Sequence, residues 1–388
     1  MNAQEKRIDA VKRFLQGEKI SIISRSLGHS RRWFYYWLER YDPSDPSWSQ
    51  DHSRKPKEVA NKTPEELERM ICEIRKRLVR TKYAQKGALI IQWELQRLGV
   101  YPVPQVWTIN RILKRHGLVV KPSHVPRGTP YPVLVANQPN DVHQLDLVGP
   151  RYLDGGQRFY GVHLIDTFSN AAALEVVSSK RAVDVVEALV TAWQRLGIPR
   201  RLQVDNELTF RGSNRYPRSF GLLIRLCLYL GVEPVFIPEA EPWRNGVIER
   251  LNDVYDKLFL RSQHFQDLLH LREELPVFET FHNTQHRYAK LSQNVPWKVH
   301  TSTPIKTLSQ TFSLHRDGLP WRDGRISFVR LTDKQGRVRF FTESFLVDET
   351  LVHEYVTGTI YTEPEVIKFT HQDRVIKTFR YSTKKKDL

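Results

Sequence analysis

The sequence predicts a multidomain protein: an all-helical N-terminal region, a central α/β core with a mixed five-stranded sheet, and a small all-β C-terminal barrel. Helical periodicity with capping residues and closing glycines runs to about residue 120. Strand-like runs then alternate with helical stretches, and from residue 304 onward only strand-like runs occur. At 388 residues the chain is too long for one ordinary domain. The predicted domains are 1–45, 63–120, 138–290 and 304–380.

Composition points to a polyanionic partner. The formal charge is +17 and the pI about 9.8, which favours nucleic acid or an anionic membrane surface. The basic residues are spread over folded segments and do not line one long amphipathic helix, so nucleic acid is the better choice. No apolar run is long enough to span a membrane, and the N-terminus lacks a hydrophobic signal core. Cys72 and Cys227 form no CxxC zinc site or disulfide framework, so we expect a reducing cytoplasm.

The first helical segment, 1–45, has the spacing of a helix-turn-helix module. Gly17 and Gly28 close two helices, and Ser30 can cap a third over 31–41. Arg31 and Arg32 would then contact phosphates or base edges from the start of the recognition helix. Residues 1–125 carry +12 of the total charge, which favours DNA binding. The alternative is an ordinary three-helix unit with surface arginines.

A second helix-turn-helix module is predicted over 63–120, with Lys114 and Arg115 on its last helix. The alternative is a unit that only packs against the rest of the chain. Segments 42–62 and 121–141 are rich in proline and polar residues and are predicted to be linkers.

The core is predicted from three strand-like runs, a helix, and then alternating strand and helix. The C-terminal runs, broken by turns such as 333–336, suggest a barrel of SH3-like size. The lysines at 384–386 are expected to form a disordered basic tail.

Three acids occur inside, or at the ends of, the predicted strands and helices of the core. Asp146 lies within an apolar strand, and Asp205 ends the fourth strand. Glu249 lies in the first turn of a helix, away from its apolar stripe. If strands one and four are neighbours, the three carboxylates meet at the carboxyl ends of the strands. They cannot all stay ionised there without a cation, and oxygen ligands favour Mg²⁺ or Mn²⁺. Alternatively, Glu249 only favours the helix dipole.

The motifs "QLDL" (144–147), "VDN" (204–206) with the downstream Phe210, and "NGVIER" (245–250) resemble the Asp-Asp-Glu catalytic core of bacterial insertion-sequence transposases and retroviral integrases. That core has a ribonuclease H-like fold, and the resemblance covers residues 140–285. It implies that the three acids hold two Mg²⁺ or Mn²⁺ ions for phosphoryl transfer. The residues implied as active-site neighbours are Asn206 and Asn245. We also expect Arg244 to contact DNA.

Two features depart from the family pattern. Glu207 stands where many members have glycine, and 43 residues separate Asp205 from Glu249, more than is usual. The surplus fits a polar loop at 211–219, which is either a plain loop or a DNA-contacting one. The loop arginines are Arg211, Arg215 and Arg218.

Other titratable residues are weaker candidates. Asp166 also ends a strand, but its side chain could cap the following turn. Asp154 fits a hairpin turn, and His143 and His163 fit core or edge positions better than catalytic bases.

The resemblance implies a DNA transposase or integrase that binds element ends, cleaves at the 3′ ends and joins the 3′-OH to target DNA. It also implies a homo-multimer on double-stranded DNA and association with the nucleoid, and it leaves open a helper ATPase. Two alternatives remain: a catalytically silent DNA-binding regulator derived from a transposase, and a ribonuclease H-like nuclease that does not join DNA.

Overall fold

The structure is a computed structural model that describes residues 1–51, 63–119, 131–213, 215, 218–314 and 319–383. The chain divides into two compact units, residues 1–63 and 64–388. Most of the first predicted linker, part of the second, and the lysines at 384–386 lie outside the described residues. In the described part of the chain, no helix combines the length and the apolar character that a membrane span requires.

The first unit contains three helices, α1 (Ala3–Leu15), α2 (Ile20–Leu27) and α3 (Arg31–Glu39). Gly28 ends α2 with φ of 70°, and the Ser30 hydroxyl accepts a hydrogen bond from the Trp33 backbone N–H at 3.2 Å. These are the turn and the cap that the sequence predicts. A small core of Ala10, Ile23 and Phe34 joins the three helices.

The second unit begins with α4 (Glu65–Arg80), α5 (Ala88–Arg97) and α6 (Val106–Arg115), which share a core of their own. Tyr83, just after α4, packs its ring edge-on to Phe278 of the central core, with centroids 5.2 Å apart. The Tyr83 carbonyl accepts a hydrogen bond from His286 Nε2 at 2.7 Å. The helices α4 to α6 therefore contact the α/β core through this aromatic residue.

The central sheet is mixed, as predicted. Its strands β1 to β3 run antiparallel to one another, while β4 and β5 pair in parallel on the other side of β1. The order of these five is β5-β4-β1-β2-β3, but among the described residues they belong to a sheet of nine strands and not to the predicted sheet of five. The strands are β1 (Val142–Tyr152), β2 (Arg158–Asp166), β3 (Ala172–Val177), β4 (Arg201–Val204) and β5 (Glu233–Phe236).

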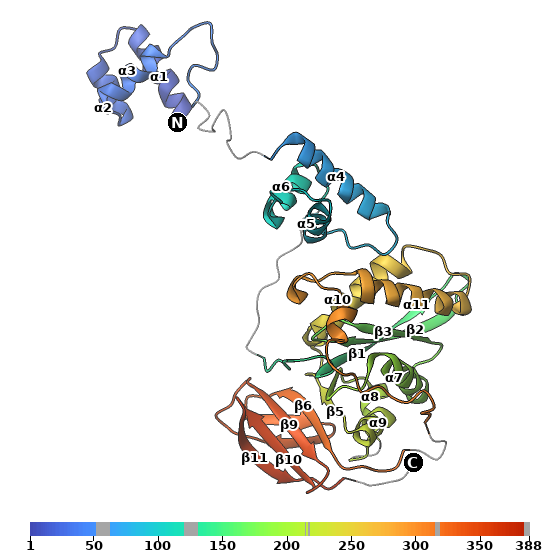
Figure 1. Cartoon of the computed structure of the whole chain (residues 1–388). Coiled ribbons are helices and arrows are strands. Elements are labelled where there is room, and N and C mark those ends of the chain that lie inside the picture. Colours follow the sequence, from blue (N-terminus) through green and yellow to red (C-terminus); the bar gives the residue numbers. More distant parts are fainter. Residues whose placement is uncertain (52–62, 120–130, 214, 216–217, 315–318, 384–388) are drawn as a thin grey trace. The chain divides into compact units, whose positions relative to one another are not determined.

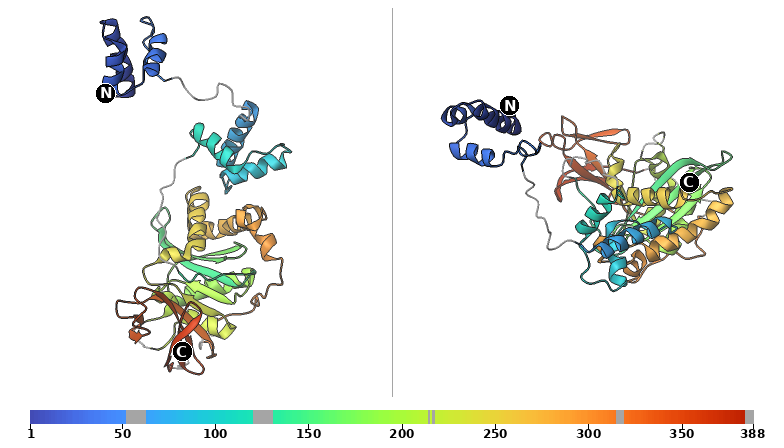
Figure 2. Two further views of the ribbon diagram at one scale, coloured as in Figure 1. Left: turned by 90° about the vertical axis from the view of Figure 1, so that its left-hand side faces the viewer. Right: turned by 90° about the horizontal axis from the view of Figure 1, so that it is seen from above.

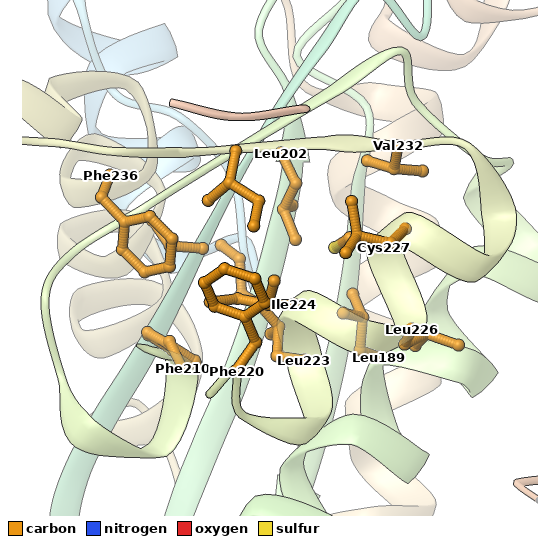
Figure 3. Close-up of a cluster of buried hydrophobic side chains, with 14 of the residues drawn as sticks. Leu189, Leu202, Phe210, Phe220, Leu223, Ile224, Leu226, Cys227, Val232 and Phe236 are labelled. Atoms are coloured by element: carbon orange, nitrogen blue, oxygen red, sulfur yellow. The ribbon is translucent and has the colours of Figure 1, made fainter. Parts of the chain in front are cut away.

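Helices cover both faces of this sheet (Figure 1). On one face lie α7 (Ala182–Leu196), α8 (Leu208–Arg211) and α9 (Leu222–Leu230). Their apolar side chains meet those of β4 and β5, where Leu189, Leu202 and Phe236 gather with Ile224 (Figure 3). On the other face lie α10 (Gly246–Tyr255), a π-helical turn (Asp256–Leu260) and α11 (Leu268–Gln285). Shorter helices at Pro242–Asn245, Ala289–Leu291 and Pro296–His300 (α12) complete the core.

The C-terminal strands differ from the predicted separate barrel. The strands β6 (Arg325–Leu331), β9 (Tyr355–Tyr361), β10 (Val366–His371) and β11 (Arg374–Arg380) extend the central sheet. Figure 2 shows these C-terminal strands in red. Strand β6 pairs in parallel with β5, and Phe236 stacks on Phe328 with ring centroids 4.7 Å apart. An unpaired β5 would leave open backbone groups at the sheet edge, and β6 satisfies them. A separate hairpin is formed by β7 (Arg337–Phe340) and β8 (Glu343–Leu346).

Candidate active site

The parallel ladder between β1 and β4 brings two of the predicted acids level with each other. Gln144 lies opposite Gln203 in this ladder. The same register, continued by two residues, puts Asp146 beside Asp205, the first residue after β4. Residues two apart on a strand project to the same face, so both carboxylates lie on the face that α10 covers. Strands one and four are neighbours, which is the condition on which the meeting of the two aspartates depends.

Two buried glutamines hold the start of α10 on these strands. Gln144 Oε1 accepts a hydrogen bond from the Ile248 N–H at 2.9 Å. Gln203 Nε2 donates to Asn245 Oδ1 at 2.8 Å and to the Arg244 carbonyl at 3.1 Å. Each strand that carries an aspartate therefore also fixes the segment that carries Glu249. Neither glutamine was predicted from the sequence as a site residue, although each stands two residues before an aspartate on the same face.

Glu249 lies in the first turn of α10 and is exposed. The apolar stripe predicted for this helix is confirmed: Ile248, Leu251, Tyr255 and the following Phe259 are buried against β2, β3 and α11. Because these residues fix the rotation of the helix, Glu249 points away from that core.

The carboxylates affect one another electrostatically. Burial raises the pKa of Asp205, and the charges of Asp146 and Glu207 raise it further. Burial likewise raises the pKa of Asp146, with a contribution from Glu207. The pKa of Glu249 is raised by partial desolvation of its carboxylate and by the charge of Asp146. A nearby cation would therefore stabilise the ionised form of each carboxylate and offset the repulsion between them.

The residue types fit a divalent cation with oxygen ligands, but the side chains are not gathered around one point. Within the described ranges, no three His, Cys, Asp or Glu side chains are arranged to hold a metal ion. Asp146 Oδ2 accepts a hydrogen bond from Asn252 Nδ2 at 2.5 Å, and Asp205 Oδ1 accepts one from the Glu207 N–H at 3.0 Å.

Asn252 and His163 orient the Asp146 carboxylate. His163 lies opposite Asp146 in the β1–β2 ladder, and its Nδ1 bonds Asn252 Oδ1 at 2.8 Å. Burial lowers the pKa of His163 to about 4, so the ring is neutral at pH 7 and Nδ1–H is the donor. His163 is therefore a core residue, as expected. The sequence reading missed Asn252, whose place three residues after Glu249 puts it on the adjoining helix turn.

The predicted neighbours Asn206 and Asn245 use their amides to fix loops. Asn206 Nδ2 donates to the Ile237 carbonyl at 2.6 Å, and Asn206 Oδ1 accepts a bond from buried Arg330 at 2.7 Å. Arg330 lies on β6, so the C-terminal strands reach the loop that follows Asp205. Glu207 forms an ion pair with Lys180 at 3.2 Å.

The weaker acid candidates have other roles. Buried Asp166 accepts bonds from the N–H groups of Phe168 and Ser169 at 2.9 and 2.7 Å, which is the turn cap that the sequence suggests. Burial alone would raise its pKa, but the His143 ring 3.6 Å away and the backbone N–H groups of Ser169 and Asn140 lower it to about 2. Asp154 lies in the β1–β2 hairpin turn and pairs with His264 at 3.2 Å.

The predicted DNA contacts fall into two groups. Arg31, Arg32 and Lys114 are exposed on α3 and α6. Arg115 forms an ion pair with Glu68. Arg244 pairs with Glu241 at 2.8 Å, bonds the Tyr355 hydroxyl at 2.9 Å and lies 4.2 Å above the Tyr131 ring.

Two arginines hold the loop between Asp205 and Glu249 in place, one through an ion pair and one through a hydrogen bond. Arg218 pairs with Glu343 of β8 at 2.8 Å, and Arg211 Nε donates to the Asn206 carbonyl at 3.0 Å. Three of the nine positions of the predicted polar loop, 214, 216 and 217, lie outside the described residues.

Comparison with known proteins gives a consistent picture. No family model matches the chain. In sequence, the chain is 26% identical over 177 residues to the Gag-Pro-Pol polyprotein of bovine leukemia virus; the match covers 44% of this chain and 11% of the polyprotein. The chain thus spans about a tenth of that relative's length.

Among solved structures, the HTLV-2 integrase catalytic core domain in complex with magnesium is 19% identical, with a TM-score of 0.34. It covers 42% of this chain and 98% of its own. The simian T-cell lymphotropic virus intasome in complex with PP2A regulatory subunit B56 gamma is 17% identical, with a TM-score of 0.40, and covers 74% of this chain and 95% of its own. The chain is thus similar in sequence to part of a retroviral polyprotein.

Proposed function

We propose that the chain is a DNA transposase or integrase that binds the ends of a mobile element, cleaves at their 3′ ends and joins the 3′-OH to target DNA. The observation that carries the proposal is the level placement of Asp146 and Asp205 on adjacent parallel strands, with the start of the Glu249 helix bonded to those same strands. We also propose that the five central strands form a ribonuclease H-like fold.

Asp146, Asp205 and Glu249 would hold two Mg²⁺ or Mn²⁺ ions. When bound, such ions supply activation of an oxygen nucleophile and stabilisation of the leaving oxygen. The chain's own residues position the ligands: Asn252 and His163 fix Asp146, while Gln144 and Gln203 fix the start of α10. Cleavage and joining are both in-line phosphoryl transfers, so one set of acids serves both.

DNA would be held first by the basic N-terminal third, through Arg31 and Arg32 in one unit and Lys114 in the other. Two element ends have to be held together for joining, so we propose a homo-multimer on DNA, working at the nucleoid in the cytoplasm. The assay below also shows whether a helper ATPase is required.

The test is an assay with purified protein, donor DNA made from the sequences flanking the gene, and Mg²⁺ or Mn²⁺. Glu249→Gln removes the charge of the proposed ligand. Asp253→Asn is the matched control, because Asp253 is an exposed acid one turn further along the same helix. Wild type and Asp253→Asn should cleave and join, whereas Glu249→Gln should bind the ends but lose at least 100-fold in cleavage.

Other outcomes have defined meanings. If every protein binds the ends but none reacts, with or without cell extract and ATP, the result would favour a catalytically silent DNA-binding regulator. Cleavage without joining would favour a nuclease, and full activity of Glu249→Gln would direct attention to Glu207.

A further inference from the structure

Arg330 is a buried arginine that the C-terminal strands place next to the candidate active site. It lies on β6 and is 6% exposed. Phe328, two residues earlier on β6, pairs with Phe236 at the end of β5. The same register, continued by two residues, carries Arg330 just beyond the end of β5. Because β4 ends level with β5, Arg330 lies beside the loops that follow both strands.

The guanidinium of Arg330 joins those two loops. Its Nη2 donates to Asn206 Oδ1 at 2.7 Å, and its Nη1 donates to the Ile237 carbonyl at 3.0 Å. Asn206 Nδ2 donates to the same carbonyl at 2.6 Å, so each of the three residues is bonded to the other two. Asn206 directly follows Asp205. The position of Arg330 therefore bears on the backbone that carries the Asp205 carboxylate.

Stability alone does not explain a guanidinium at this position. Its central carbon lies 5.2 and 5.5 Å from the ring centroids of Phe328 and Phe340, where an apolar side chain would cost less to bury. Burial lowers the pKa of Arg330 to about 10, so it stays charged at pH 7, and its Nε has no hydrogen-bond partner among the described residues. Glu239, 4.0 Å away, is 61% exposed and is a weak counter-ion. What the guanidinium adds over an apolar side chain is its hydrogen bonds to the two loops.

We propose that Arg330 is a positioning residue for phosphoryl transfer, and that the C-terminal strands set the place of Asp205 through it. The inference rests on the proposed function for the role of Asp205 as a ligand. Arg330 acts through Asn206: the guanidinium fixes the amide, and the amide fixes the loop between β4 and α8. A planar guanidinium reaches both acceptors at once, which the single ammonium of a lysine does not reproduce. The catalytic unit of this chain thus includes β6 and does not end with α11.

Hydrogen exchange of the full-length protein without metal tests the link between β6 and the loop. The Glu207 N–H donates to Asp205 Oδ1 at 3.0 Å, so its exchange reports on that carboxylate. In Arg330→Lys it should exchange at least tenfold faster than in wild type, because the loop loses an anchor. Unchanged exchange in Arg330→Lys would overturn the proposal.

Arg225→Lys is the matched control for the exchange experiment. Arg225 is also a buried arginine, 4% exposed, but its guanidinium donates to the Leu319 carbonyl and not to the loop after Asp205. Arg225→Lys should therefore leave the exchange of the Glu207 N–H and the rate of cleavage unchanged. Faster Glu207 exchange in this variant as well would show a general loosening of the fold and would contradict the specific link.

Kinetics test the positioning role. Arg330→Lys and Asn206→Ala should each lower the single-turnover rate constant for cleavage about 100-fold, while donor-DNA affinity stays within about twofold. Because both act on one link, the double variant should be within about twofold of the slower single variant, whereas independent effects would multiply to roughly 10⁴-fold. A multiplied loss, or a loss of DNA affinity in place of rate, would contradict the proposal.

A second variant covers the case in which Arg330→Lys does not fold. Arg330→Met places an apolar side chain beside the two phenylalanine rings, so it should unfold at the same or a higher temperature than wild type. It should nevertheless cleave about 100-fold more slowly, since it makes no bond to Asn206. A stable Arg330→Met with the wild-type rate would overturn the positioning role.

The two proposals fail differently. Cleavage by wild type together with full activity of Arg330→Lys or Arg330→Met removes the positioning role and leaves the proposed transposase intact. Faster Glu207 exchange in Arg330→Lys, without any cleavage by wild type, supports the link from β6 to Asp205 and contradicts the reaction.

Discussion

Gln144 on β1 and Gln203 on β4 lie directly opposite each other in a parallel ladder, and each bonds the segment that begins α10. Asp146 and Asp205 follow them by two residues each, on the same face. One pair of amides thus sets the position of Glu249 relative to both aspartates. Five predictions follow from this arrangement and from the surfaces around it.

The first prediction concerns the charge of Asp146. Its pKa is raised by burial, so its contribution to stability is complete below the ordinary aspartate pKa and is lost as pH rises through the raised value. Asp146→Asn should therefore unfold at a higher temperature than wild type at pH 7 in the absence of divalent ions, while cleavage disappears. Thermal unfolding and the cleavage assay check this, and a lower melting temperature for the variant would contradict it.

The second prediction concerns metal binding. Mg²⁺ or Mn²⁺ at ten times its dissociation constant should stabilise wild type by about 1.4 kcal/mol. The same titration should leave Asp146→Asn nearly unchanged, and Asp253→Asn should respond like wild type. Thermal unfolding across a metal series measures the effect. Equal stabilisation of Asp146→Asn would show that the ions bind elsewhere.

The third prediction concerns acid sensitivity through His163. Its pKa is lowered to about 4, so its contribution to stability is complete above the ordinary value of 6.5 and is lost as pH falls toward 4. His163→Gln keeps a donor for Asn252 but does not titrate. Its free energy of unfolding should fall less steeply between pH 6 and 5, by about 1.4 kcal/mol per pH unit relative to wild type. Parallel denaturant curves for the two proteins would contradict the assignment.

The fourth prediction concerns Asn252, which connects His163 to Asp146. Asn252→Leu removes both hydrogen bonds and lets the carboxylate turn. The rate constant kcat for cleavage should fall about 100-fold, while DNA affinity stays within about twofold, because the ligand is misplaced without loss of a DNA contact. Single-turnover cleavage and equilibrium binding measure the two effects. A loss of DNA affinity with kcat preserved would assign Asn252 to DNA contact instead.

The fifth prediction distinguishes exposed from engaged arginines in the first unit. Arg31 and Arg32 are exposed at the start of α3, whereas Arg13 is bonded to Glu18 at 2.6 Å. Arg31→Gln and Arg32→Gln should each reduce the slope of log affinity against log salt by about 0.9, one phosphate contact each. Arg13→Gln should leave the slope unchanged. Equal slopes in all three variants would exclude α3 as the phosphate-binding helix.

Local structure could be read from the sequence because its signals are local. The turn at Gly28, the cap at Ser30 and the apolar stripe of α10 all depend on residues a few positions apart. The order of strands and helices likewise predicted a mixed sheet, whereas the adjacency of the first and fourth strands was only assumed and is seen in the structure. The three short motifs led to a resemblance to transposases and retroviral integrases, and the chain also matches part of a retroviral polyprotein in sequence.

The tertiary structure alone decided which distant groups meet. Ile248 bonds Gln144 across 104 positions, Asn252 bonds Asp146 across 106, and Arg330 bonds Asn206 across 124. No periodicity or capping rule relates residues so far apart, because their contact depends on the order and register of the strands. The joining of β6 to β5 has the same origin: the sequence marks both as strands, but an edge that needs a partner exists only once the sheet has formed.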